Sequence, residues 1–409
     1  MKFTVHHRIA QPLKRFVEFE AASGVLMVAA GALALVIANS SWHLGFSGLW
    51  SHRAGVRMGG VVRLDELTIR DWINDAGLAL FFLLAGIEVK RQLVVGELRD
   101  KRAAALPIFG ALGGMVVPAV IYLTINPHAP ASRGWGTTVA TDLALAAAVV
   151  IALGSRVPPA VKAFIVTLAV VDDVGGVIVV ALFYGHGLSW KWVALVVLMV
   201  SVTIGLRRSN VSWVSAYVPA GVVTWYGFRR AGIEPALCGV LFGLMIPVAD
   251  PLGSGSQAEQ SDVMNTSDEL DESPMERIEN ALNPLVSFAV LPLFALANSG
   301  IRVTGATFNK HVVSGVVVAR LAGKVLGISG FVWFAMRMGW GRLTNGLTMR
   351  HIVGMGCAAG MGFTVSLFVS EKAFGATALD TSAKAGVLIA AMTSGVLSFV
   401  LLRKSANSA

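Results

Sequence analysis

The chain has 409 residues, of which 55% are apolar and only 14% are charged, and its mean hydropathy is +0.70. Soluble domains carry about 25% charged residues, so this composition excludes a soluble globule, a disordered chain and a secreted disulfide scaffold. The net charge of +9 is typical of a membrane protein with basic cytoplasmic loops. Cys238 and Cys357 lie in apolar runs without metal-ligand spacing, so we expect them to serve packing.

Apolar runs along the chain are long enough to cross a membrane as helices, since a span needs about 20 mostly apolar residues. No run shows the alternation of a barrel strand. The sequence therefore predicts an all-α polytopic membrane protein, a single integral membrane domain over residues 1–409. The twelve predicted spans are 21–39, 71–93, 103–124, 131–153, 158–184, 190–206, 211–229, 233–248, 281–301, 312–336, 350–370 and 382–402. The run at 233–248 is short and is expected to tilt little or to be partly re-entrant.

The first run follows basic residues and resembles a signal peptide, but it is too long for one, so we expect it to remain as a span. With the N-terminus in the cytoplasm, Lys and Arg are more frequent on the cytoplasmic side than outside, which favours cytoplasmic N- and C-termini. Residues 40–70 then form an outer loop. Gly55, Gly59 and Gly60, followed by alternating polar and apolar residues, predict a β-hairpin there.

The loop at residues 249–276 contains eight acidic residues and no Lys or Arg. This composition favours a disordered acidic linker on the cytoplasmic side, with a binding element as the alternative.

Charged residues within the apolar runs are the first candidates for function, because each costs at least about 2.5–3.5 kcal/mol at the bilayer centre. They are Glu88, Asp142, Asp172, Asp173, Glu234, Arg320 and Lys324. Asp172 and Asp173 lie near the middle of their run, and adjacent side chains on a helix point about 100° apart. We therefore expect one to face a cavity and the other a partner helix. The alternative is a buried pair, neutralised by Lys324 and Arg320, that only joins helices.

Two runs are predicted to be broken near mid-membrane. In the run 131–153, an unwound centre would provide Thr141 and free carbonyls as oxygen ligands, while Asp142 offsets the positive end of a half-helix. An intact helix with both side chains bonded to the preceding turn is the alternative. The run 350–370 holds four glycines within nine residues, which weakens a helix there. These runs are the fourth and eleventh, each the centre of a three-helix unit, and the two units have inverted topology.

Lys324 is placed to reach the negative ends of the half-helices or one of the two aspartates. Arg320 lies on the same helix face, and its role stays open. Oxygen ligands with one or two carboxylates suit Na⁺, Li⁺ or a proton rather than zinc or copper. Competition between H⁺ and a metal ion for the same oxygens couples their fluxes without covalent chemistry or a cofactor, so we predict a transporter rather than an enzyme.

Specific stretches add a family resemblance. They are FFLLAGIEVKR at 81–91, ATD at 140–142, DDVGGVIVVALFY at 172–184, LPLFALAN at 291–298, GK at 323–324 and GMGFT at 360–364. Together they resemble the NhaA family of bacterial Na⁺/H⁺ antiporters along nearly the whole chain. The resemblance implies twelve inner-membrane helices with inverted repeats, the fourth and eleventh broken and crossing at mid-membrane, and a periplasmic hairpin that helps to form a homodimer. It also implies electrogenic, pH-regulated extrusion of Na⁺ or Li⁺ in exchange for more H⁺.

By position, the resemblance implies that Asp173 is the principal cation-binding carboxylate and Asp172 its partner, which can pair with Lys324. Lys324 then serves as charge compensation or as proton carrier. Asp142 and Thr141 match the crossing of the broken helices. The resemblance further assigns a cytoplasmic cluster linked to pH response, which comprises Glu88, Arg91 and Glu279.

The chain departs from the family pattern in places that leave its pH range and pH sensor open. Glu234 stands where a pH-related histidine can occur, Gln92 where an acid is common, and Arg320 where an apolar residue is expected. The hairpin region and the acidic loop are both enlarged.

Two other functions remain as alternatives. An intramembrane protease would need an aspartyl dyad, but the Tyr-Asp and Gly-x-Gly-Asp patterns are absent around Asp142 and Asp172. A Gly-x-Ser-Gly motif occurs at 327–330, but the next histidine, His351, is predicted at a membrane edge. A passive cation channel is the second alternative, and it would carry current without moving protons.

Overall fold

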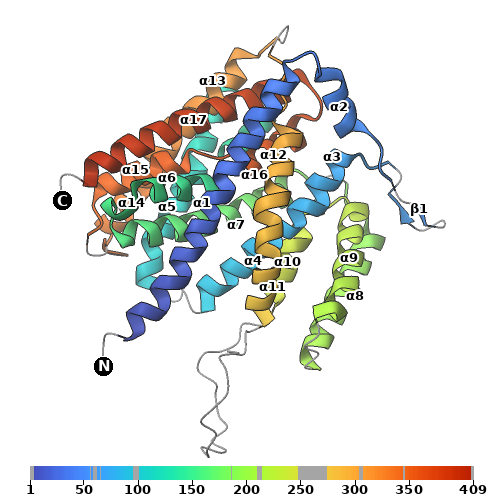
Figure 1. The fold of residues 1–409 in the computed structure, drawn as a ribbon, viewed down its shortest axis with the longest axis horizontal. Helices are drawn as coiled ribbons and strands as arrows, with labels where there is room; N and C mark the ends of the chain where they lie inside the picture. The colour runs from blue at the N-terminus through green and yellow to red at the C-terminus, as the bar shows by residue number, and fades with distance from the viewer. Residues whose placement is uncertain are drawn as a thin grey trace, which may run out of the picture.

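The computed structural model describes residues 4–55, 57–58, 62–64, 66–94, 101–185, 187–209, 214–246, 274–303, 307–343 and 346–406. These residues are almost entirely helical (Figure 1). The helices are α1 (Thr4–Ala38), α2 (His43–Ser51), α3 (Ile69–Trp72), α4 (Leu78–Val94), α5 (Lys101–Ile125), α6 (Leu143–Leu153), α7 (Pro159–Phe183), α8 (Trp190–Arg208), α9 (Val214–Ala231), α10 (Leu237–Met245), α11 (Pro274–Leu285), α12 (Leu291–Asn298), α13 (Lys310–Val318), α14 (Lys324–Arg337), α15 (Met349–Ala359), α16 (Thr364–Phe374) and α17 (Ala378–Ala406). Turns of π-helix join α3 to α4, α11 to α12 and α13 to α14 at Ile73–Gly77, Val286–Val290 and Ala319–Gly323.

Within these described residues, eight helical stretches are long and apolar enough to cross a membrane, and two bent helix pairs raise the number to ten. They match ten of the twelve predicted runs. The eight stretches are Ala21–Ala38, Ile69–Val94, Ala104–Ile125, Pro159–Phe183, Trp190–Arg208, Met275–Asn298, Lys310–Arg337 and Ala378–Ser405. The chain is therefore a multi-pass membrane protein.

The runs 211–229 and 233–248 are helical but are not among these ten. The 18-residue α9 carries Arg229 and Arg230 in its last turn, and they lower its mean hydropathy. The nine-residue α10 rises about 13 Å, too little to cross a hydrocarbon core of about 30 Å as a helix alone.

The segment 40–70 contains a helix, α2, that the sequence reasoning did not predict, and two short strands. Strands β1 (Arg57–Met58) and β2 (Val62–Arg63) pair antiparallel, with Arg57 opposite Arg63 and Met58 opposite Val62. Most of the acidic loop predicted at 249–276 lies outside the described residues, and its last three residues begin α11.

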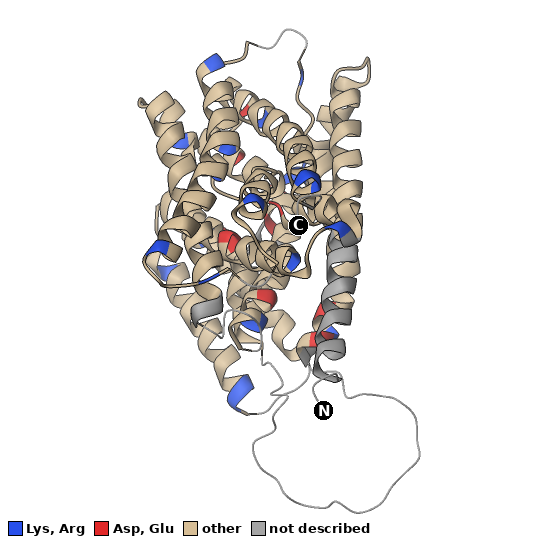
Figure 2. Cartoon of the chain, turned by 90° about the vertical axis from the view of Figure 1, so that its left-hand side faces the viewer, with Lys and Arg blue, Asp and Glu red and all other residues tan. Residues whose placement is uncertain are grey.

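The helices that surround the two bent pairs pack closely. Helix α5 meets α14 at Gly113 and Gly327, where a Cβ on either glycine would lie 2.1 Å from the carbonyl oxygen of the other. In Figure 1, α5, α6, α14 and α15 lie on the side of the C-terminus, whereas α8, α9 and β1 lie on the opposite side. Charged residues lie mainly toward the ends of the helices, with a few inside the bundle (Figure 2). Asp142, Asp172, Arg320 and Lys324 are among the buried charged residues, and they build the site.

Candidate ion-binding site at the crossing of two broken helices

The breaks predicted in the runs 131–153 and 350–370 are present, and they lie against each other. A 3₁₀ segment, Ala131–Thr138, is followed by α6 at an angle of 42°, and α15 is followed by α16 at 49°. At the contact, the Asp142 amide donates to the Met361 carbonyl at 3.1 Å, and the Thr141 hydroxyl donates to the Ala359 carbonyl at 3.0 Å. Four half-helix ends therefore meet inside the protein.

Asp142 binds the positive ends of two half-helices at once. It is the N-cap of α6, where Oδ1 accepts from the amides of Ala144 and Leu145 at 3.1 and 3.4 Å. Its Oδ2 accepts from the amide and the hydroxyl of Thr364, the first residue of α16, at 3.2 and 2.9 Å. A buried carboxylate in this place satisfies orphan amides and complements both helix dipoles. This arrangement agrees with the prediction that Asp142 offsets the positive end of a half-helix, while its part in binding a cation or proton stays a prediction.

Lys324 lies on the other side of the crossing and pairs with Asp172. Its Nζ donates to Asp172 Oδ2 at 2.8 Å, to the Thr141 hydroxyl at 3.0 Å and to the Val139 carbonyl. Lys324 is 0% exposed and Asp172 is 1% exposed. Within the part of the chain that the structure describes, Asp172 Oδ1 has no hydrogen-bond partner.

Asp173 faces a different environment from its neighbour. It lines a cavity of about 60 Å³ that also reaches Thr141, Asp142 and Thr364 at the crossing. One carboxylate thus binds a partner helix through Lys324 while the next lies at a cavity wall. This is the division that the helical spacing predicted.

Arg320, whose role the sequence left open, lies fully buried at the same crossing. Its guanidinium donates to the carbonyls of Thr137, Ala140 and Gly360 at 2.5, 2.8 and 3.1 Å and to the Ser366 hydroxyl at 2.7 Å. Four backbone carbonyls at the breaks, those of Thr137, Val139, Ala140 and Gly360, are therefore bound to Arg320 or Lys324. That free carbonyls at the unwound centre bind a cation stays a prediction.

The residues implied in a pH response lie together beside the same cavity. Arg91 forms ion pairs with Glu279, at 2.7 Å, and with Glu88. Gln92 donates to Glu88 at 2.9 Å, so an amide stands where the family commonly has an acid. All three charged residues line the cavity that contains Asp173.

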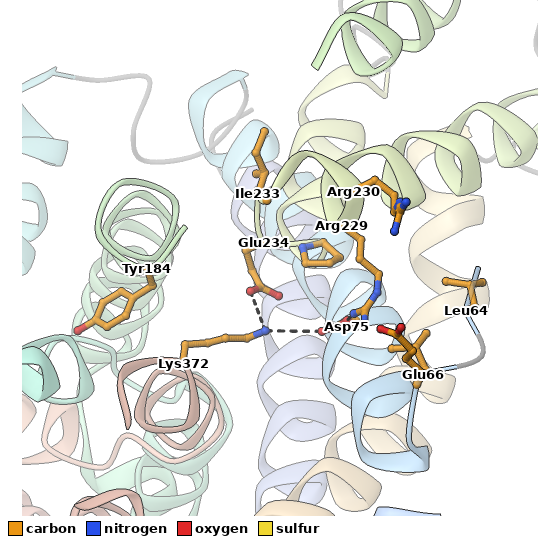
Figure 3. Close-up of a pocket in the computed structure, with 12 residues that line it drawn as sticks. Leu64, Glu66, Asp75, Tyr184, Arg229, Arg230, Ile233, Glu234 and Lys372 are labelled. Carbon is orange, nitrogen blue, oxygen red and sulfur yellow. Dashed lines mark hydrogen bonds and ion pairs between the residues drawn. The ribbon is translucent and has the colours of Figure 1, made fainter. Parts of the chain in front are cut away.

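Glu234 lies away from the crossing, in a second cavity of about 350 Å³ (Figure 3). It pairs with Lys372 of α16 at 2.9 Å, and Lys372 in turn lies 3.8 Å from Asp75, which also pairs with Arg229. Figure 3 shows Lys372 reaching from α16 toward Glu234 and Asp75. At the position that the family resemblance links to a pH-related histidine, this chain thus carries a buried glutamate paired with the partly exposed Lys372.

Comparison with known proteins places this geometry in a family. Residues 14–402 match the family model described as Na⁺/H⁺ antiporter 1. The chain belongs to this family of Na⁺/H⁺ antiporters. Its members are transporters, not enzymes, so an intramembrane protease is no longer an alternative. In agreement, the Ser329 hydroxyl donates to the Val325 carbonyl of its own helix, and His351 Nδ1 bonds to Thr348.

Individual antiporters from several bacteria are similar to the chain over almost their whole length. The chain is 37% identical to Na⁺/H⁺ antiporter NhaA 1 of Klebsiella pneumoniae, over 99% of this chain and 98% of the relative. It is 36% identical to NhaA of Anaeromyxobacter, over 97% of this chain and 92% of the relative. It is 37% identical to NhaA of Vibrio cholerae, over 96% of this chain and 97% of the relative.

Sequence reasoning missed several residues that line the cavities of Asp173 and Glu234 or contact the crossing. Asp75 and Lys372 lie near the ends of apolar runs, where a charge is ordinary, so nothing in the sequence marked them. Ser366 and Thr364 lie in the eleventh run. Their hydroxyls, two and four residues after Gly362, were the one available signal.

Proposed function

We propose that this antiporter extrudes Na⁺ in exchange for H⁺ by competition of the two ions for Asp172 and Asp173. The supporting observation is the contrast between the two adjacent carboxylates. Asp172 is bound to the buried Lys324, and Asp173 lines a cavity that extends from the helix crossing to the cluster of Glu88, Arg91 and Glu279. A Na⁺ ion that enters this cavity meets carboxylate and hydroxyl oxygens, the ligands that hard cations prefer.

The proposed exchange uses Lys324 as the internal counter-charge. With Asp172 and Asp173 deprotonated, Na⁺ binds between them and displaces the Lys324 ammonium from Asp172. The ammonium keeps the Val139 carbonyl and the Thr141 hydroxyl as acceptors. Thr141 and Asp142 then provide further oxygens at the edge of the site. After alternating access exposes the site to the other side, two protons replace Na⁺. Either both bind to the carboxylates while Lys324 stays an ammonium, or Lys324 gives up its proton when Na⁺ binds and later takes up one proton to restore its ion pair with Asp172, while Asp173 takes up the other.

We assign the cluster of Glu88, Arg91 and Glu279 to the pH response. It lies at the end of the cavity that faces the cytoplasm if the N-terminus is cytoplasmic. Its three charges are held in contact by two ion pairs, so protonation of either glutamate changes the charge at the cavity entrance. Gln92 cannot titrate, which removes one group from this response.

The proposed architecture has twelve crossings in the bacterial inner membrane, with both termini in the cytoplasm. Helix α9 supplies the seventh membrane span. Helix α10 supplies the eighth together with the buried connection around Glu234 and Ala236. Non-helical backbone at membrane depth is tolerated where protein surrounds it. The units 103–184 and 312–402 form the inverted repeats, and β1 and β2 lie on the periplasmic face and join two copies as a homodimer. The proposed transport is electrogenic and accepts Li⁺ as well as Na⁺.

Everted membrane vesicles with a preformed pH gradient test this function. Addition of Na⁺ or Li⁺ is expected to release protons and collapse the gradient, whereas K⁺ is not. A pH series gives the activation range. A gradient that persists with all three ions contradicts antiport, and a Na⁺ current without proton movement favours a channel.

A further inference from the structure

Arg320 binds both helix breaks through one guanidinium. Nε donates to the Gly360 carbonyl in the break between α15 and α16, and Nη2 donates to the Ala140 carbonyl in the other break. Nη1 donates to the Thr137 carbonyl and to the Ser366 hydroxyl on α16. These contacts come from both sides of the crossing, and the side chain is 0% exposed.

The carbonyls that Arg320 binds lie at the negative ends of half-helices. The segment Ala131–Thr138 and helix α15 both end at the crossing, so their last carbonyls lack partners within the helix and carry the negative ends of the helix dipoles. Lipid offers no hydrogen-bond donor, so each unsatisfied backbone group at membrane depth costs several kcal/mol. A buried cation with several fixed donors meets this need, and arginine has five N–H groups.

The backbone is shaped to admit the guanidinium. A Cβ at Gly362 would lie 1.5 Å from Arg320 Nη2 and 2.3 Å from the Ala140 carbonyl oxygen. Residue 362 therefore leaves room for the guanidinium only when it has no side chain. The contact is part of the way the two broken helices approach each other.

We propose that Arg320 is a positioning residue for the exchange reaction. Its guanidinium neutralises the carbonyl ends of the half-helices at the crossing and thereby leaves Lys324 to pair with Asp172. The inference rests on the proposed function and deepens it. The Lys324 ammonium has three N–H donors, and it already donates to the Val139 carbonyl, the Thr141 hydroxyl and the Asp172 carboxylate. Without the guanidinium, more carbonyls compete for that ammonium, so the pairing of Asp172 and its competition with Na⁺ both change.

This role differs from a merely structural one in what it predicts for transport. A structural arginine affects how much folded protein reaches the membrane, but each folded copy exchanges ions normally. A positioning arginine also sets the Na⁺ concentration for half-maximal exchange and the pH profile. Loss of its positive charge makes the ionised carboxylates less favourable, so the profile moves to more alkaline pH.

The test compares Arg320→Met, Arg320→Lys and wild type in everted vesicles, with exchange measured over Na⁺ concentration and pH and normalised to the amount of antiporter in the membrane. We expect Arg320→Met to raise the half-maximal Na⁺ concentration by about tenfold or more, as for the loss of one or more charge-assisted hydrogen bonds, and to shift the profile toward alkaline pH. Arg320→Lys keeps the positive charge but loses the planar guanidinium with its several fixed donors. Its half-maximal Na⁺ concentration and pH profile should therefore lie between those of Arg320→Met and wild type. Arg337→Met, an exposed arginine at the end of α14, is the matched control and should behave as wild type.

The outcomes separate the inference from the proposed function. Wild-type affinity and pH profile in Arg320→Met overturn the inference while antiport stands. If Arg320→Met does not reach the membrane, Arg320→Lys decides, because wild-type values in that variant also overturn it. A wild type that moves no protons on addition of Na⁺ refutes the proposed function and this inference with it.

Discussion

The ion pair between Lys324 and Asp172 makes a quantitative prediction about stability. Asp172→Asn leaves the Lys324 ammonium without its anion at a position that is 0% exposed. Breaking a buried ion pair by removing one partner costs about 3–5 kcal/mol, because the remaining charge stays desolvated. The double variant Asp172→Asn/Lys324→Met has no such charge. We expect it to lose less free energy of unfolding than the sum of the two single variants, by about 1–3 kcal/mol.

The assay is SDS-induced unfolding of the purified proteins, followed by tryptophan fluorescence. Asp380→Asn is the matched control, since Asp380 forms an ion pair with Lys384 at the same 2.8 Å distance within α17, away from the crossing. The side chains of Lys384 and Asp380 are 8% and 11% exposed. The free energy of unfolding should therefore fall less in Asp380→Asn than in Asp172→Asn. An Asp172→Asn protein as stable as wild type, or strictly additive losses in the double variant, would refute the reasoning that Lys324 and Asp172 neutralise each other in the interior.

Two further predictions concern exchange itself. Asp173→Asn should abolish Na⁺-driven proton release while the protein remains in the membrane, because an amide binds Na⁺ weakly and carries no proton to exchange. Near-normal release in vesicles would contradict the assignment. Gly362→Ala should abolish exchange, because its Cβ has no room beside Arg320, whereas Gly330→Ala in α14 should be neutral, because a Cβ there meets no atom within 4 Å. Equal activity of the two alanine variants in the same vesicles would rule out the close approach.

Much of the fold follows from apolar periodicity, and the breaks follow from residues that a lipid-exposed helix has no reason to carry. Asp142 next to Thr141, and four glycines in the eleventh run, indicated where each helix is interrupted. The opposite environments of Asp172 and Asp173 followed from the 100° step between neighbours on a helix. These features depend on local sequence, which is why they could be predicted.

The position of Arg320 could not be predicted in the same way. Three of its four partners are backbone carbonyls, one 40 residues from it on one side and two 180 and 183 residues from it on the other, and carbonyls carry no sequence signal. Lys372 was missed because a lysine near the end of a span ordinarily faces water. Its pairing with Glu234 depends on how α16 packs beside the connection between α9 and α10, which only tertiary structure determines.

The central claim, that H⁺ and Na⁺ compete for Asp172 and Asp173, is tested most directly by recording the pH of a weakly buffered solution of the purified antiporter while Na⁺ is added. The account predicts that Na⁺ binding releases protons from the wild type, and that choline at the same ionic strength releases none. Asp173→Asn should release none with either salt. Na⁺ binding to the wild type without proton release, or release that persists in Asp173→Asn, would contradict the account.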